Sequence, residues 1–307
     1  MSLHDGQRRA SHTTNPVVFE FAIVTAVFGG LYLWQEALRG SILSLFDLSF
    51  GGVLADGLVY TGLFLGGLAA FAVPYARYRG IRIGLSLPTR TDARVLGLAA
   101  VGPVALAALT KLVGVLTGVS YSSLTMTAVA ADAPLTPVLA IAGLGILLGT
   151  PALVIVCQVL VQGSFEQAVG STTAVVLTPL VAGFALLSET GGLGPVPDLG
   201  KLIGVVLFTL LLAGSVAGAQ RIGSGRRRIL AATPVALFVA VVVLSGIAEI
   251  ESVAGGLFVL LHFAVLGIAA YGYERSDSLL VPAVTYTSLL LANSLIVYFF
   301  EAGMQSW

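Results

Sequence analysis

The sequence LGIAAYGYERSDSLLVPAVTYTSLLLANS, residues 266–294, contains two apolar segments separated by a short charged turn. Glu274, Arg275 and Asp277 form the turn, and Pro282 lies at the start of the second segment. Both segments continue beyond the quoted residues, to the length of about 20 residues that an α-helix needs to cross a bilayer. The stretch therefore predicts two membrane-spanning helices joined by a turn at the membrane surface.

The composition of the whole chain agrees with this prediction. Charged residues make up only 10% of the 307 residues and hydrophobic residues 57%, whereas soluble domains carry about 25% charged residues. This difference excludes an ordinary soluble domain. The apolar runs do not alternate with polar residues in segments of about 10, as the strands of a membrane barrel would. We therefore expect an all-α, polytopic integral membrane helical bundle, because each helix satisfies its own backbone hydrogen bonds in lipid.

The apolar runs predict about nine transmembrane helices, with eight as the lower count. They cover residues 16–38, 52–75, 95–119, 135–161, 172–188, 202–219, 229–247, 253–273 and 279–300. On this basis the chain divides into a polar N-terminal tail (1–15), a two-span region with a basic loop (16–84) and a helical core (85–307).

The distribution of basic residues predicts the orientation in the membrane. Cytoplasmic loops of membrane proteins are enriched in Lys and Arg. With the N-terminus inside, nine spans place the basic segments 8–9, 77–94 and 221–228 in the cytoplasm, whereas the outer loops carry acidic residues such as Asp132 and Glu249. We therefore expect a multi-pass protein of the cell membrane, with a cytoplasmic N-terminus and an external C-terminus.

The letters around the charged turn, GYERSDSL followed by Pro282, resemble those of one family. The consensus LGxxxGYxYERTGSLxxPAxxH is typical of the CAAX protease and bacteriocin-processing enzymes (CPBP, also called Abi), which are intramembrane metalloproteases. The resemblance covers roughly residues 85–300 and implies a helical core around a zinc-dependent site. In the consensus a zinc-ligand histidine follows the proline, and Tyr286 occupies that place here.

The other motifs of the family can be aligned in two registers. An intact site combines Glu-Glu-x-x-x-Arg, Phe-x-x-x-His and a final histidine, so that imidazoles and a carboxylate hold the metal and a glutamate activates water. In the first register residues 149–170 match the first motif, with Leu153 and Val154 at the glutamates and Gln158 at the arginine. In the second register that motif falls near residues 205–212, where no carboxylate occurs. Both registers stay open, and both lack the metal ligands and the base.

Four polar residues of the apolar spans are candidate site residues: Gln158, His262, Tyr286 and Asn293. His262 follows Phe258 by four positions and is the one histidine inside a predicted span. A catalytic zinc needs about three protein ligands, so we expect no cofactor, and zinc only if displaced ligands rebuild the site. The alternative for His262 is a hydrogen-bonded interior histidine, and for the last span it is interhelical hydrogen bonding.

Lys111 lies inside the span predicted at residues 95–119. A charge near the bilayer centre costs at least about 2.5 kcal/mol, so its side chain needs a partner or a polar environment. It could extend to the membrane surface, pair with a carboxylate such as Asp56, or line a polar pathway with Asp56.

The sequence leaves three functions open, and whether the protein is an enzyme is one of the open points. The first is a catalytically inactive relative of the family, a pseudo-protease that serves as scaffold or regulator of membrane partners. The second is an active CAAX-like metalloendopeptidase with displaced ligands, among them His262. The third is a small-molecule or ion permease that uses Lys111. Expected partners are the lipid bilayer and other membrane proteins or lipidated peptides; a net charge of zero gives no indication of nucleic acid.

Overall fold

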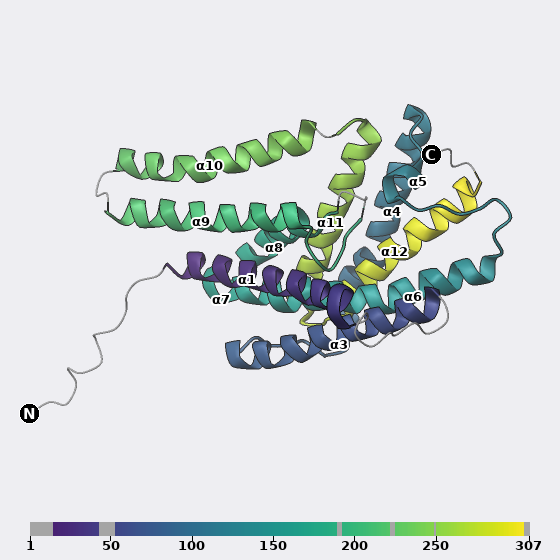
Figure 1. The fold of residues 1–307 in the computed structure, drawn as a ribbon, viewed down its shortest axis with the longest axis horizontal. Coiled ribbons are helices and arrows are strands. Elements are labelled where there is room, and N and C mark those ends of the chain that lie inside the picture. Colours follow the sequence, from purple (N-terminus) through teal and green to yellow (C-terminus); the bar gives the residue numbers. More distant parts are fainter. Residues whose placement is uncertain (1–14, 43–52, 189–191, 222–224, 249, 304–307) are drawn as a thin grey trace, which may run out of the picture.

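The structure is a computed structural model that describes residues 15–42, 53–188, 192–221, 225–248 and 250–303 (Figure 1). Within these ranges the regular elements are helices, accompanied by two isolated β-bridges. The α-helices are α1 (Pro16–Ala37), α3 (Val53–Arg79), α4 (Ala93–Thr117), α5 (Tyr121–Thr125), α6 (Leu135–Val154), α7 (Gly163–Val169), α8 (Ser171–Leu186), α9 (Leu199–Arg221), α10 (Gly225–Ala248), α11 (Val253–Ser276) and α12 (Leu280–Glu301). Three short helices of other types are η1 (Leu38–Ile42), η2 (Arg90–Asp92) and η3 (Ile155–Gln162).

Seven helical segments of the described chain are long and apolar enough to cross a membrane. They are Pro16–Gly40, Ala55–Arg79, Arg90–Thr117, Leu135–Val169, Leu199–Gly218, Val253–Ser276 and Leu280–Glu301. Two shorter apolar helices, Ser171–Leu186 and Thr233–Ala248, accompany them. Each of the nine predicted spans overlaps one of these nine segments, which confirms the helical fold class. How many of them cross the bilayer, and on which side the N-terminus lies, stay predictions.

The first helix begins at a polar cap. The Oδ1 atom of Asn15 accepts the backbone N–H of Val17 at 3.0 Å, and Pro16 occupies the first helical position. Both are typical helix-start features, because the first N–H groups of a helix have no partner within it. Of the predicted polar tail, residues 1–14 lie outside the described chain.

The predicted hairpin at residues 266–294 is present as helices α11 and α12. Asp277 ends α11 with a positive φ of 48°, and its N–H donates to the carbonyl of Tyr273 at 2.8 Å. Aspartate tolerates this left-handed backbone conformation better than most residues. The reversal places α11 beside α12, and α4 packs against both helices.

The connection between α3 and α4 (residues 80–92) is bound to the α11–α12 turn. The carbonyl of Gly84 accepts the N–H of Leu279 at 2.8 Å, and the Ser86 hydroxyl donates to the Asp277 carbonyl at 2.7 Å. A Cβ atom at Gly84 would overlap that carbonyl. Part of the predicted basic loop is therefore held by hydrogen bonds to the turn instead of extending freely from the membrane.

The helix that begins as α6 continues through the π-helical η3 and α7 to Val169. Pro151 lies just before η3 and has no N–H to donate to the helix ladder. Seven of the eight η3 residues, from Val156 to Gln162, are buried. π-helical turns often occur at functional sites, and this one is enclosed by protein.

Much of the outer surface is apolar. On α4 the side chains of Leu112, Val115 and Leu116 are more than half exposed, and α10 packs mainly on α9, beside which it runs in Figure 1. Contiguous exposed apolar surface of this kind is typical of proteins that face lipid or other proteins. The chain is therefore built as a multi-span membrane protein.

Candidate functional site

A cleft of about 340 Å³ lies among α6, α11, α12 and the segments around residues 125–127 and 192–195. Its volume falls in the range of small-molecule sites. Three of the four polar candidates, His262, Tyr286 and Asn293, line it together. The remaining lining residues are Thr125, Thr127, Ala142, Gly145, Ile146, Gly149, Leu153, Gly192, Leu193, Pro195, Leu289, Leu290 and Ser294.

The fourth candidate, Gln158, contacts the cleft through Tyr286. Its Nε2 group lies 3.1 Å from the hydroxyl oxygen of Tyr286, and both side chains are fully buried. The contact joins one motif position from each register: Tyr286 stands at the histidine position of the closing motif, which anchors the second register, and Gln158 stands at the arginine position in the first register. Leu153 and Val154, at the glutamate positions of that register, are buried hydrocarbon side chains that offer no metal ligand and no base.

His262 presents one ring nitrogen to its own helix and the other to the interior. Nδ1 lies 2.8 Å from the backbone carbonyl of Phe258. Because a carbonyl oxygen can only accept, Nδ1 must carry the hydrogen, and Nε2 of the neutral ring keeps its lone pair. Nε2 is buried, as is the whole side chain, which is 1% exposed, and it has no hydrogen-bond partner among the residues that the structure describes. In the Phe-x-x-x-His pattern, the histidine therefore binds the carbonyl four residues earlier in its own helix. Its second ring nitrogen remains an acceptor without a partner among the described residues.

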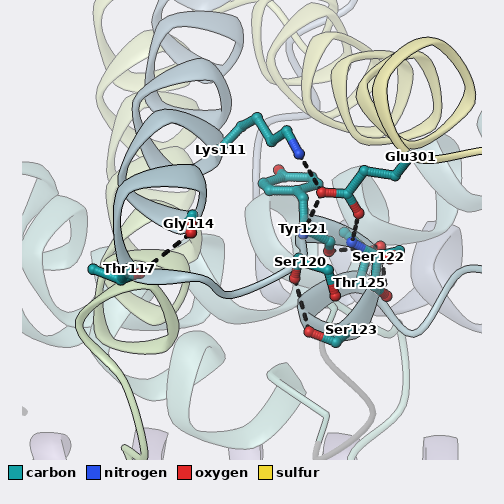
Figure 2. Close-up of polar contacts among 9 residues, drawn as sticks. All are labelled: Lys111, Gly114, Thr117, Ser120, Tyr121, Ser122, Ser123, Thr125 and Glu301. Atoms are coloured by element: carbon teal, nitrogen blue, oxygen red, sulfur yellow. Dashed lines mark hydrogen bonds and ion pairs between the residues drawn. The ribbon is translucent and has the colours of Figure 1, made fainter. Parts of the chain in front are cut away.

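Lys111 is paired with Glu301, the last residue of α12 (Figure 2). The Glu301 carboxylate also accepts the backbone N–H groups of Tyr121 at 2.7 Å and Ser122 at 2.5 Å. These N–H groups open the short helix α5, where they have no helical partner of their own. One buried carboxylate thus neutralises the Lys111 ammonium and fixes the start of α5.

Tyr121 connects this ion pair to the cleft. Its hydroxyl donates to Oδ1 of Asn293 at 2.7 Å, and its ring contacts Phe258 edge-on with centroids 5.9 Å apart. Burial, together with the nearby Glu301 charge, raises the pKa of Tyr121, so the hydroxyl stays a neutral donor. Tyr121 thus binds the Asn293 amide directly, and it contacts Phe258, whose carbonyl binds the His262 ring.

Sequence reasoning missed Glu301 and Tyr121. A signal for Glu301 exists, because a carboxylate at the end of an apolar span needs a cation and Lys111 is one of few available in the spans. Tyr121 has no comparable signal, since its role depends on helices far apart in the sequence. Asp56, proposed together with Lys111 as a pathway, lies in the first turn of α3. Neither Asp56 nor Lys111 is among the described residues that line the cleft.

A second ion pair joins α1 to α3. Arg79 binds Glu20, and the guanidinium also lies 5.8 Å from the Phe19 ring centroid. One helical turn earlier the Tyr75 hydroxyl lies 2.5 Å from the Ser164 hydroxyl of α7. These contacts attach the first two helices to the α6–α7 unit and have no direct connection with the cleft.

The polar side chains that line the cleft do not fit a catalytic zinc ion. In the described part of the chain no three His, Cys, Asp or Glu side chains lie close enough to share a metal. His262 would be a single ligand, and the remaining polar groups beside it are amide, phenol and hydroxyl groups, whereas zinc sites use imidazole, thiolate and carboxylate.

No family model, curated protein or solved structure matches this chain. The resemblance to CPBP enzymes therefore stays a prediction that depends on the letters of residues 149–170 and 266–294. Those two stretches are in contact in the fold, through α6, η3 and α12. This contact is a property of the helix packing and is independent of any family.

Proposed function

We propose that this protein is a non-catalytic scaffold or regulator of membrane partners, a pseudo-protease with the helical frame of an intramembrane protease but without its chemistry. We place it in the cell membrane, with a cytoplasmic N-terminus. The observation that carries the proposal is the closed contact between Gln158 and Tyr286. Hydrolysis by a metalloprotease needs a metal-activated water, whereas Gln158 and Tyr286, which each stand at a motif position of one register, are an amide and a phenol that bind each other.

The surroundings of this contact support the same proposal. A satisfied hydrogen bond between two buried neutral groups contributes about 0.5–1.5 kcal/mol to stability. Gln158 lies in η3, which is buried along almost its whole length, and Leu153 lies one turn before it. The segment thus serves to pack helices together, and the apolar outer faces of the bundle remain for lipid and partner helices.

Partner helices would associate with those outer faces by close packing, because lipid provides little hydrophobic drive between helices. α10 offers such a face: Leu237, Val241 and Leu244 are more than half exposed, and the helix packs mainly on α9. This arrangement suits a membrane protein that binds other membrane proteins.

The two alternative functions have weaker support. A metalloendopeptidase with displaced ligands would have to rely on His262, which has no second imidazole beside it in the described chain. A permease that uses Lys111 would have to open the ion pair with Glu301, and this pair also fixes α5.

The test combines metal analysis and a cleavage assay on the full-length protein purified in nanodiscs with crosslinking in native membranes. We expect well under one zinc ion per chain, no cleavage of a farnesylated peptide, and a crosslinked membrane partner in native membranes. Stoichiometric zinc that disappears in His262→Ala, together with cleavage of the peptide, would overturn the proposal in favour of the enzyme.

A further inference from the structure

We infer that the cleft beside His262 binds a neutral amphiphile whose polar end carries a hydroxyl group. The inference goes beyond the proposed function, since it concerns a ligand site and does not depend on whether the protein cleaves peptides or holds partners. Three observations carry it: a buried acceptor without a partner among the described residues, a donor on the neighbouring helix at about the same depth, and apolar walls.

The acceptor is Nε2 of His262. Its tautomer is fixed by the Phe258 carbonyl, so Nε2 presents a lone pair in a place that is 1% exposed. Buried polar atoms nearly always have a hydrogen-bond partner, and no described residue supplies one here. The missing partner is a donor that enters the cleft from outside the protein.

The donor is the amide of Asn293. Its Oδ1 atom accepts the Tyr121 hydroxyl, so the Nδ2 group remains to donate. α11 and α12 run antiparallel from the turn at residues 277–279. His262 and Asn293 lie about equally far from that turn, roughly 20 Å along their helices at a rise of about 1.5 Å per residue. His262, which carries the acceptor, and Asn293, which carries the donor, therefore line the same cleft at about the same depth.

These two groups select the chemistry of the ligand. A hydroxyl can donate to Nε2 and accept from Nδ2 at the same time, whereas a carboxylate cannot donate and an ammonium cannot accept. The cleft residues carry no formal charge, and Ile146, Leu153 and Leu289 are part of its walls. An uncharged, hydroxyl-bearing molecule with an apolar body fits this combination.

Glycines on α6 create the space. Gly145 and Gly149 line the cleft, and a Cβ atom at Gly145 would meet nothing within 4 Å. A large side chain at Gly145 can therefore fill the cleft without a clash in the helix. Gly143 has equally open surroundings but is not among the cleft residues, so the same substitution there is a matched control.

The experiment uses the full-length protein in nanodiscs and a photoreactive diazirine derivative of 1-decanol. Labelled peptides are identified by mass spectrometry, and labelling of cleft residues on α6 and α12 is normalised to labelling of Thr233–Ala248, which does not line the cleft. We expect saturable cleft labelling that 1-decanol displaces about three- to tenfold more effectively than decyl methyl ether, which cannot donate a hydrogen bond.

His262→Asn should remove this preference. The shorter amide can still donate to the Phe258 carbonyl but does not reach the position of Nε2, so the alcohol and the ether should then compete equally. Because the readout is a ratio within one variant, a change in overall stability does not imitate it. His262→Gln, whose amide reaches further, should restore part of the preference.

Gly145→Phe should abolish cleft labelling, and Gly143→Phe should leave it unchanged. The inference would be overturned by equal competition of alcohol and ether in the unmodified protein, which would indicate a water on Nε2, or by cleft labelling that persists in Gly145→Phe. Neither result alters the zinc and cleavage measurements that test the proposed function.

Discussion

The amide nitrogen of Gln158 lies 3.1 Å from the hydroxyl oxygen of Tyr286, although the two residues are 128 positions apart in the chain. The contact joins η3 to α12 at the centre of the bundle, where both side chains are fully buried. The same region holds the cleft and the free nitrogen of His262. The polar side chains of this region are neutral amide, phenol and imidazole groups, and we therefore interpret the site as one for binding.

Removing the Tyr286 hydroxyl should destabilise the protein. In Tyr286→Phe the buried Gln158 amide loses its partner, which costs about 1–3 kcal/mol. Thermal unfolding in detergent should show this loss, and Tyr271→Phe should not, because Tyr271 is 44% exposed. Equal stability of the two variants would contradict the importance of the pair.

Breaking the Lys111–Glu301 pair should cost more. Glu301→Gln leaves the mostly buried ammonium without a counter-charge, with an expected loss on the order of 3 kcal/mol. The double variant Lys111→Met/Glu301→Gln should recover most of it, because no unpaired charge remains. Glu36→Gln is the control: the Glu36–Arg39 pair is at least half exposed at 3.9 Å, and such surface pairs contribute about 0–1 kcal/mol. Chemical unfolding of the four proteins measures the difference.

The close approach of Gly84 to the Asp277 carbonyl should make Gly84→Ala disruptive. The added methyl group has to displace the α3–α4 connection from the α11–α12 turn, at a cost of about 1–3 kcal/mol. Limited trypsin digestion should then cut faster at Arg82 and Arg90. Gly97→Ala, where a Cβ meets nothing within 4 Å, should digest like the unmodified protein.

The raised pKa of Tyr121 predicts a loss of stability at high pH. Above its ordinary pKa of about 10 the unfolded chain releases the phenol proton, whereas the folded protein retains it. The unfolded state is then favoured by up to about 1.4 kcal/mol per pH unit until the folded-state pKa is reached. Unfolding between pH 9 and 11 should therefore show a steeper decline for the unmodified protein than for Tyr121→Phe. Parallel curves would contradict the prediction.

The predicted orientation can be tested by labelling. The free Cys157 is buried, so it should not react in the folded protein. In intact cells an impermeant maleimide should label Ala130→Cys, which nine spans place outside, and should label Thr91→Cys only after lysis. The reverse result would place the N-terminus outside.

The amino-acid sequence by itself determined the class of fold and the positions of the helices. Long apolar runs can satisfy their backbone groups in lipid only as helices, so the α11–α12 hairpin followed from residues 266–294 alone. The sequence also showed that, in the first register of the predicted family resemblance, the hydrocarbon side chains of Leu153 and Val154 stand where the motif has carboxylates. These conclusions need only local information, because they concern length, polarity and side-chain chemistry.

Only the tertiary structure decided which polar groups meet. Lys111 binds Glu301 because α4 packs against α12, and Asn293, His262 and Tyr286 share one cleft because α6 and α11 pack beside the same helix. All of these helices are apolar on most sides, so their composition does not specify their neighbours. In lipid, neighbours are selected by close packing and by the few polar contacts between helices, and these depend on the whole three-dimensional arrangement.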